Sequence, residues 1–562
     1  MKTFVSIVDK IVRILIVLFF SAIIIIGLMQ IISRYAFSLP IVWADEAQKY
    51  LFIWMVMIAA AYGIRKKKHV AADVVLGNVG PRVKAVMEVL IELVSLALFI
   101  LFIVLAPRMI RVNIATISPT LGIPMGYVYY AMLIILFVSF VILLLIGAPI
   151  AYSMGFSSLL ALILSGSTFP LEVVVQRTFS MLNSYSLLAI PFFILAGDLM
   201  SAGGISKRLI KFATAAVGHL PGNVAQVSIL SGMIFAGVSG SSVADAAAIG
   251  GVMIPAMKEK GYDKGWTAAL QAAVSTMGPI IPPSMNMIVY GSLTGISVGA
   301  MFMGGIIPGV CIGVLCMLYV AFLATKRKDK FPYLAPDGKF IGWKALGKAF
   351  LNAVLALLTP VIIIGGIISG LFTATEAGIV ASLYAMIIGL FVYRTLTIRD
   401  IPKILIKSAL TSASVLLIAA MAGPFAWLMG VAMFPQHTVA WLAQLTSNPY
   451  IVLLLLVLFL LVLTCFVEVL AAMILVAPVL SAVCTSYGFN PIFFAVVMVI
   501  SLLIGQITPP VGVLLYVTSG IAECSFTDIC RKIWPFIAIL VITVLLCVAF
   551  PGMITLIPNS LM

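Results

Sequence analysis

Two proline-interrupted segments with the same pattern lie inside otherwise apolar sequence. The first is Gly278-Pro-Ile-Ile-Pro-Pro-Ser284 and the second is Gly505-Gln-Ile-Thr-Pro-Pro510. Paired prolines lack amide donors and prevent a continuous helix. Such a break is tolerated at membrane depth only where the backbone is buried in protein or lines a watery cavity. Corresponding breaks in two halves of a chain are the best sequence indication of a secondary transporter's binding site.

The spacing around the two breaks is repeated as well. Gly261-Tyr262 and Gly488-Phe489 stand at the same distance before them, with apolar segments of equal length between. The pattern therefore predicts two corresponding halves, each with a broken helix, that meet around a site near the bilayer midplane. It does not by itself predict that one half is inverted relative to the other.

A run rich in glycine and serine, Gly237-Val-Ser-Gly-Ser-Ser242, precedes the first break. Serine hydroxyls and freed carbonyls are the hard oxygen ligands that a cation such as Na+ takes. Close packing of transmembrane helices also selects small residues and serine, so the run alone leaves both interpretations open. Its combination with the repeated break favours a binding site.

Four acidic residues lie within apolar sequence: Asp198, Asp245, Glu376 and Glu468. Ionisable groups at membrane depth are costly, so each is a candidate functional residue unless it lies near a loop. Glu468 is the deepest of the four, in the apolar run 450–480. No lysine or arginine adjoins either break, so an anionic substrate there would be met by helix N-termini, hydroxyls and bound cations.

An intramembrane protease is the competing enzyme interpretation. Gly237-Val-Ser239-Gly240 resembles the GxSG motif of rhomboid-type serine proteases. That chemistry needs a histidine base within hydrogen-bond reach of the serine. The three histidines, His69, His219 and His437, all lie outside the candidate spans. The duplicated break also has no role in a protease, which disfavours this alternative.

Composition places the chain among membrane proteins. Its 562 residues are 63% hydrophobic and only 9% charged, whereas soluble domains carry about 25% charged residues. We therefore expect an all-α polytopic membrane protein. The net charge of +15 is spread over short loops such as Arg65-Lys-Lys-Lys68 and Lys326-Arg-Lys328, which fits positive-inside topology and not nucleic-acid binding. The seven cysteines lack CxxC pairing and indicate no transition-metal site.

The first 147 residues predict four spans, 11–33, 46–64, 84–106 and 125–147. The basic start and the basic cluster after the second span place the N-terminus in the cytoplasm. The first apolar run is long and lacks a small-x-small cleavage site, so we interpret it as a retained span. Further along, the charged segment 326–345 is the expected cytoplasmic linker between a first repeat, 148–325, and a second, 346–562.

These motifs together resemble a known family. The chain is similar to the fused membrane component of a tripartite ATP-independent periplasmic (TRAP) transporter, with a DctQ-like small region and a DctM-like large region. The small-region likeness rests on Pro40-Ile-Val-Trp-Ala-Asp-Glu46, Leu51-Phe-Ile-Trp54 and the Arg65 to His69 stretch. The large-region likeness rests on five motifs in order: Leu188-Ala-Ile-Pro-Phe-Phe-Ile-Leu-Ala-Gly197, Val238-Ser-Gly-Ser-Ser-Val-Ala-Asp-Ala-Ala-Ala-Ile-Gly250, Pro279-Ile-Ile-Pro-Pro-Ser284, Phe372-Thr-Ala-Thr-Glu-Ala377 and Thr508-Pro-Pro-Val-Gly512.

The resemblance implies an ion-transporter-type inverted repeat. Two helical hairpins and two broken helices would form an elevator-type transport domain, and a four-helix small region would enlarge the static scaffold. The implied activity is Na+-driven import of a small organic acid across the bacterial inner membrane. A periplasmic substrate-binding protein, the P subunit, would deliver the acid. Two or more Na+ ions and no organic cofactor are expected, in a monomer surrounded by membrane lipid.

The resemblance also carries over individual residues. Ser239, Ser284 and Glu468 would contact the substrate, and no catalytic residue is expected. The expected Na+ ligands come from both halves: Ser239, Ser241, Ser242, Gly278, Pro282, Thr464, Gly505, Thr508, Pro509 and Gly512.

One departure from some fused relatives concerns the junction of the two regions. Between the loop Ser118-Pro-Thr-Leu-Gly-Ile-Pro124 and the large-region motifs there is room for one span only. We expect a small region at 1–124 and a helix at 125–147 that serves both regions. A stand-alone Na+/carboxylate symporter stays as the alternative function, although such a carrier has no need of the small region.

Overall fold

The computed structural model describes residues 2–37, 41, 44–65, 150–164, 169–327, 329, 331–334, 340–446, 448–465, 467–509 and 512–561. All regular structure in these ranges is helical, which confirms the expected all-α fold. Six of the helices are long and apolar enough to cross a membrane, or up to ten if each sharply bent pair counts as one span.

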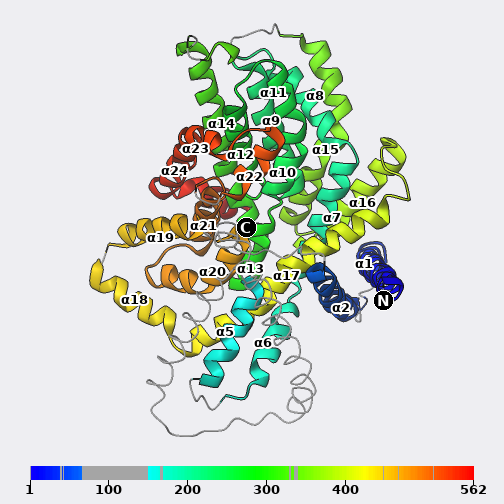
Figure 1. Ribbon diagram of the computed structural model, residues 1–562, viewed down its shortest axis with the longest axis vertical. Helices are drawn as coiled ribbons and strands as arrows, with labels where there is room; N and C mark the ends of the chain where they lie inside the picture. Colours follow the sequence, from blue (N-terminus) through cyan, green and yellow to red (C-terminus); the bar gives the residue numbers. More distant parts are fainter. Residues whose placement is uncertain are drawn as a thin grey trace.

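Two helices of the small region are described, α1 (Lys2–Ala36) and α2 (Ala44–Arg65). They pack side by side against α16 (Ala374–Ile387) and α17 (Ile401–Val431), as Figure 1 shows at its lower right. They contain the predicted spans 11–33 and 46–64. The predicted spans 84–106 and 125–147, including the helix shared by both regions, lie outside the described residues and stay predictions.

Glu376 anchors this small region to the rest of the chain. Its carboxylate closes a capping box with Thr373 at the start of α16, and Arg34 of α1 donates to it at 3.3 Å. The Glu376 side chain is only 4% exposed, and Tyr35 packs edge-on against Phe372 beside it. A buried carboxylate is stabilised by such partners. The acid in the Phe372-Thr-Ala-Thr-Glu376 motif therefore has a structural explanation.

The large region holds the remaining helices. The first half contains α5 (Ile150–Leu164), α6 (Glu172–Leu182), a 3-10 turn (Ser186–Leu188), α7 (Ala189–Ala202), α8 (Ile205–Val217), α9 (Asn223–Ser239), α10 (Ser242–Ala248), α11 (Gly250–Glu259), α12 (Lys264–Ser275), α13 (Met285–Thr294) and α14 (Val298–Lys326). After a 3-10 turn (Pro332–Leu334), the second half contains α15 (Trp343–Ile368), α16, a π-turn (Ile388–Val392), α17, α18 (Phe434–Leu445), α19 (Pro449–Thr464), α20 (Val469–Ser486), α21 (Pro491–Gly505), α22 (Val513–Ala522), α23 (Phe526–Lys532), α24 (Trp534–Ala549) and α25 (Gly552–Leu561).

Each half contains a helical hairpin followed by a broken helix. The hairpins are α9 with α10–α11 and α19 with α20, and the broken helices are α12–α13 and α21–α22. The repeated glycine-aromatic motif forms the turn between hairpin and broken helix, because Gly261 and Gly488 both have a φ of +79°. The next residue in each case, Asp263 or Asn490, caps the new helix through its side chain. A left-handed glycine followed by a side-chain cap explains why this motif recurs.

The two broken helices pair in opposite directions. α12, the first part of one, packs against α22, the second part of the other, while α13 packs against α20 and α21. Figure 1 shows α12 and α22 together above α13 and α21. The two halves are therefore inverted relative to each other, a relation that the sequence repeat left open.

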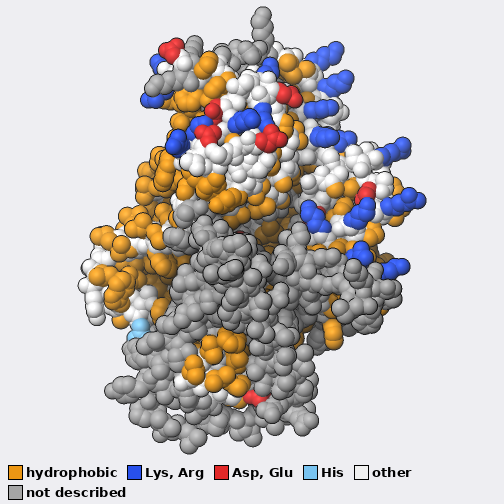
Figure 2. All heavy atoms as spheres, in the orientation of Figure 1, with side chains coloured by type: hydrophobic (Ala, Val, Ile, Leu, Met, Phe, Trp, Pro, Cys, Tyr) orange, Lys and Arg blue, Asp and Glu red, His pale blue; other side chains and the backbone are white. Residues whose placement is uncertain are grey.

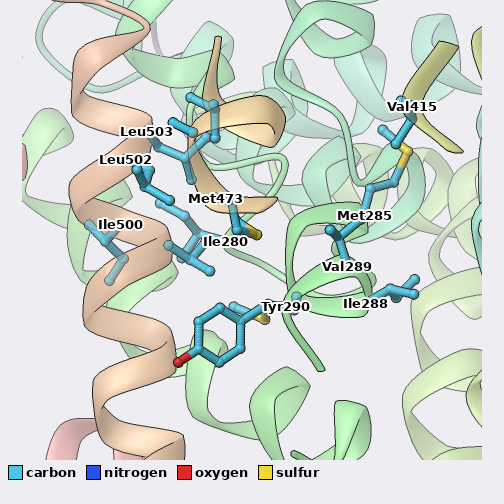
Figure 3. Packing of buried hydrophobic residues seen from close by; sticks show 14 of the residues in the cluster. Ile280, Met285, Ile288, Val289, Tyr290, Val415, Met473, Ile500, Leu502 and Leu503 are labelled. Atoms are coloured by element: carbon cyan, nitrogen blue, oxygen red, sulfur yellow. The ribbon is translucent and has the colours of Figure 1, made fainter. Parts of the chain in front are cut away.

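Apolar residues seal the centre of this arrangement. Figure 3 shows Ile280, from the first break, among Leu502 and Leu503 of α21 and Met473 of α20. All four side chains are fully buried. The first break is thus packed against α20 and α21 of the second half, and its backbone is shielded from lipid as a membrane protein requires.

Gly505 allows the second hairpin to touch its broken helix. A Cβ built on Gly505 would lie 2.7 Å from the backbone carbonyl carbon of Thr464 and closer still to the Thr464 side chain. Real Cβ atoms do not approach backbone that closely, so only glycine fits unless the hairpin moves.

Ion pairs join the two halves at one end of the molecule. Lys532 of α23 contacts Asp263 at 2.6 Å and Asp528 at 2.7 Å, and Lys258 contacts Glu523 at 2.8 Å. Burial raises the pKa of Asp263, but the hydrogen bond and charge of Lys532, with hydrogen bonds from the backbone amides of Trp266 and Gly265, outweigh burial and lower it below its usual value. Burial likewise lowers the pKa of Lys532, yet its two carboxylate partners bring a net increase.

We predict that Gly505→Ala lowers the thermal unfolding midpoint of the purified protein by about 3 °C or more, because overpacking forces the hairpin away. Gly520→Ala is the matched control, since a Cβ at this exposed position of α22 meets nothing within 4 Å. The unfolding midpoints of both variants are measured by size-exclusion chromatography of samples heated to a series of temperatures. Equal midpoints for the two variants would contradict the close contact.

We also predict that Lys532→Met lowers the midpoint by about 1 to 2 °C at pH 7. The lowered pKa of Asp263 means that its contribution is present above about pH 4 and is lost as the pH falls through the folded-state value. The difference from wild type should therefore close below about pH 4. Lys260→Met, at the exposed end of α11, should show no difference at any pH; a pH-independent difference for Lys532→Met would refute the prediction.

Candidate functional site

The first hairpin tip and the first break touch through their backbones. α9 ends at Ser239, Gly240 follows with a φ of +64°, and the Ser241 side chain caps α10. The amide of Met285 donates to the carbonyl of Gly240 at 3.4 Å. A Cβ on Gly240 would lie 2.5 Å from the Pro283 carbonyl oxygen. The glycine is therefore needed both for its left-handed backbone and for this approach.

A buried carboxylate lies at this contact. The Ser239 hydroxyl donates to Oδ1 of Asp245, and Asp245 is only 1% exposed. Its second oxygen, Oδ2, has no hydrogen-bond partner among the described residues and faces the α-carbon of Gly278 in the first break. Burying a carboxylate oxygen without a partner is strongly unfavourable. A cation bound between the tip and the break would remove that penalty.

Ser284 shapes the break itself. Its hydroxyl oxygen accepts from the amide of Met287 at 3.2 Å and so caps α13. The same hydroxyl donates to the carbonyl of Pro279 at 2.5 Å, across the prolines. The side chain therefore fixes the path of the backbone through the break and the direction in which α13 leaves it.

A hydrogen bond connects the two halves at the site. The Ser242 hydroxyl donates to Oε1 of Gln506 at 2.7 Å, and both side chains are buried. Ser242 begins α10 in the first hairpin, while Gln506 follows α21 in the second break. The first hairpin tip is thus bonded to the second break as well as touching the first.

The second half repeats the arrangement with different side chains. Thr464 ends α19 and lies against Gly505, and its hydroxyl donates to the Leu460 carbonyl at 2.8 Å. Thr508 donates to the Ile504 carbonyl at 2.7 Å. Gly512 has a φ of +47° and is the N-cap residue that precedes α22. Each threonine oxygen keeps acceptor capacity after donating its proton, so both can still ligate a cation.

Glu468 occupies the second hairpin tip. Its side chain caps α20 by accepting from the amide of Ala471 at 3.1 Å. In the described part of the chain, no hydrogen bond or ion pair joins it to Ser239 or Ser284. Two of the three predicted substrate residues therefore lie in touching segments of the first half, and the third lies in the second hairpin. Pro282 and Pro509 lie within the two breaks.

Asp245 and Gln506 lie at the site but were not among the predicted ligands. Asp245 could have been included, because it is an acid six residues after Ser239 in apolar sequence. Gln506 could have been found as the only amide side chain in either repeated break. Their partners, however, come from the spatial meeting of segments far apart in the chain, which no local pattern reveals.

Helix ends of both polarities surround these residues. α9, α12, α19 and α21 end at the tips and breaks, and α10, α13, α20 and α22 begin there. Carbonyl ends favour cations and amide ends favour anions. The arrangement can therefore hold a cation and an anion close together without a lysine or arginine.

The other candidate groups have different partners. Asp198 in α7 contacts Lys407 at 2.5 Å and Ser408 at 2.7 Å in α17, which makes it a link between those two helices. His219 packs edge-on against Phe340. Within the described ranges, no three His, Cys, Asp or Glu side chains are grouped as a metal site. The predicted Na+ ligands are instead hydroxyls and backbone.

Two family models match the chain. One, described as the DctQ component of tripartite ATP-independent periplasmic transporters, matches residues 7–149. The other, the DctM component of the same transporters, matches residues 137–553. The predicted order, a small region followed by a large region in one chain, is therefore confirmed.

Individual relatives agree with both matches. The chain is 31% identical to the isethionate TRAP transporter permease protein DctMQ of Oleidesulfovibrio alaskensis, over 91% of this chain and 88% of that protein. It is 38% identical to the sialic acid TRAP transporter large permease protein SiaM of Vibrio cholerae, over 74% and 96%. It is 34% identical to the C4-dicarboxylate TRAP transporter large permease protein DctM of Rhodobacter capsulatus, over 76% and 99%.

These relatives are named as transporter permeases and not as enzymes, so the protease interpretation is set aside. The two component matches lie in one chain with the paired breaks and the inverted repeat. The chain belongs to the TRAP transporter family and combines the DctQ and DctM components in one membrane permease.

Proposed function

We propose that this permease uses a Na+ gradient to import a small organic acid anion delivered by a periplasmic substrate-binding protein. The observation that carries the proposal is the buried Asp245 carboxylate, whose free oxygen faces Gly278 where the first hairpin tip meets the first break. A group in that setting favours a hard cation, and Na+ suits oxygen ligands.

The first cation site would use Ser239, Ser241 and Asp245 with the backbone around Gly278 and Pro282. Bound Na+ would neutralise the carboxylate and hold the hairpin tip against the break. A second site would use the related elements of the other half: Thr464, Gly505, Thr508, Pro509 and Gly512. The inverted repeat has two tips and two breaks, which supports a proposal of two bound ions and not one.

The anion would bind between the two cation sites. The amide end of α13, behind Ser284, and the amide end of α20, behind Glu468, both begin at the site and favour negative charge. Glu468 itself would repel an acid group, so we assign its carboxylate to a hydroxyl or amine of the substrate or to a bound cation. The acid group would face Ser284 and the Na+ ions.

The relatives narrow the class of substrate. Their names refer to isethionate, sialic acid and C4-dicarboxylates, all of which are small organic acids. We propose a substrate of this class for the present chain. The match to both components supports dependence on the third, soluble component of a tripartite system.

The mechanism we propose is an elevator. The hairpins and broken helices, α9 to α13 and α19 to α22, would move together as the transport domain. α1 and α2, anchored on α16 and α17, would belong to the static scaffold. Ion and anion binding would neutralise the polar tips before they cross the membrane. We place the permease in the bacterial inner membrane as a monomer with a cytoplasmic N-terminus.

Uptake into proteoliposomes tests the proposal directly. A panel of labelled small organic acids is supplied with and without the cognate binding protein, under an inward Na+ gradient or a proton gradient alone. We expect uptake only with both Na+ and the binding protein. Uptake without the binding protein would indicate a stand-alone symporter, and uptake driven equally by a proton gradient would refute Na+ coupling.

Asp245→Asn should raise the half-saturating Na+ concentration for uptake by about tenfold or more, because the variant removes the buried negative charge that favours the ion. Asp198→Asn is the matched control, since Asp198 is also an acid in apolar sequence but contacts Lys407 and Ser408. Its half-saturating Na+ concentration should change by less than about twofold. An Asp245→Asn variant with wild-type Na+ dependence would remove Asp245 from the site.

A further inference from the structure

The surface between α8 and α15 has a feature that transport does not explain. A cavity of about 370 Å3 lies between these helices, within the size range of small-ligand sites. Phe212 and Ala216 of α8 line one side, four residues apart. The other side is one face of α15, formed by Trp343, Leu346, Gly347 and Phe350. The lining is almost wholly apolar, so the cavity suits a hydrocarbon chain.

The position of α15 sets the depth of the groove. This helix is long and apolar enough to cross a membrane, from Trp343 to Ile368. The Trp343 side chain is 80% exposed at the start of the helix, and tryptophan favours the headgroup level of a bilayer. The groove therefore begins at the membrane surface and follows the first two turns of α15 toward the hydrocarbon.

Unpaired positive charge flanks the groove. Lys344 and Lys348 are one turn apart on α15, and Lys207 and Lys211 are one turn apart on α8. Like charges four residues apart destabilise a helix, and neither helix contains an acidic residue. Over the ranges that the structure describes, no carboxylate pairs with any of the four lysines.

Arg208 is already occupied, since it stacks on Tyr393. Figure 2 shows Lys and Arg side chains gathered along the edge of the molecule where α8 and α15 lie in Figure 1.

We propose that this groove is a binding site for an anionic phospholipid of the bilayer. One acyl chain would lie against Phe212, Gly347 and Phe350, and the headgroup phosphate would face the lysines at the membrane surface. Apolar lining and free positive charge occur together at headgroup depth, and an anionic phospholipid complements both at once. A zwitterionic lipid would also fill the groove and carries a phosphate, but the cationic group of its headgroup offsets that charge, so it would complement the four lysines less well.

Gly347 provides a direct way to fill the groove. A Cβ at Gly347 meets nothing within 4 Å, and Gly347 lines the cavity, so Gly347→Leu directs a side chain into it. Gly365→Leu is the matched control, because Gly365 is equally open and lies five turns further along the same face of α15. Both substitutions replace an exposed helical glycine and should be well tolerated.

The test is native mass spectrometry of the full-length purified permease incubated with phosphatidylglycerol or phosphatidylcholine. We expect wild type and Gly365→Leu to retain phosphatidylglycerol in preference to phosphatidylcholine. Gly347→Leu should reduce retained phosphatidylglycerol by about fivefold or more. Lys344→Gln with Lys348→Gln should lower the preference by about fivefold per lysine, whereas Lys260→Gln with Lys403→Gln should not.

Three outcomes would overturn the proposal. Equal retention of both lipids by wild type would show that the lysines do not select an anionic headgroup. Wild-type retention by Gly347→Leu would show that no acyl chain occupies the groove. An unchanged preference in the Lys344/Lys348 double variant would place any anionic lipid elsewhere. None of these results depends on transport, so the proposal can fail while the transport mechanism holds.

Discussion

The fold depends on one constraint of membrane proteins: backbone that is not helical must have its polar groups hydrogen-bonded or enclosed by protein. Two breaks and two hairpin tips interrupt the apolar core, and each must be enclosed by protein. Gly240 and Gly505 make this possible, because they let one irregular segment touch another where any side chain would collide. The Ser242–Gln506 hydrogen bond then joins the halves across the centre. Enclosure of this kind brings helix ends, hydroxyls and the Asp245 carboxylate to the tips and breaks, and we propose that ions bind there.

The acidic side chains of this protein differ in the partners that they contact. Three acids away from the tips have direct cationic partners: Glu376 has Arg34, Asp198 has Lys407, and Asp263 has Lys532. These pairs hold helices together and need no ligand. Asp245, by contrast, has only the Ser239 hydroxyl on one of its oxygens among the described residues. The partners of a carboxylate, and not its burial alone, therefore distinguish the acids that link helices from Asp245, the acid that we propose to bind a cation.

Much of the fold was predictable from the sequence because its signals are local. Paired prolines mark the breaks, and the glycine-aromatic motifs at 261 and 488 mark the turns before them. The repeat itself carries no direction in space, so the inversion of the halves could be expected only from the family resemblance. Glu376 looked functional because its partner, Arg34, is 342 residues away. Gln506 was missed although it is the only amide side chain in either break, because its partner, Ser242, is 264 residues away. Contacts between segments far apart determine the site, and local patterns contain no information about them.

The central claim is that the tips and breaks together form sites for Na+. Equilibrium binding of radioactive 22Na+ to the purified permease, measured by scintillation proximity without substrate or binding protein, tests it most directly. The account predicts saturable binding that unlabelled Na+ displaces and K+ does not, with more than one ion per chain. An absence of saturable binding, or displacement by K+ as effective as that by Na+, would contradict it.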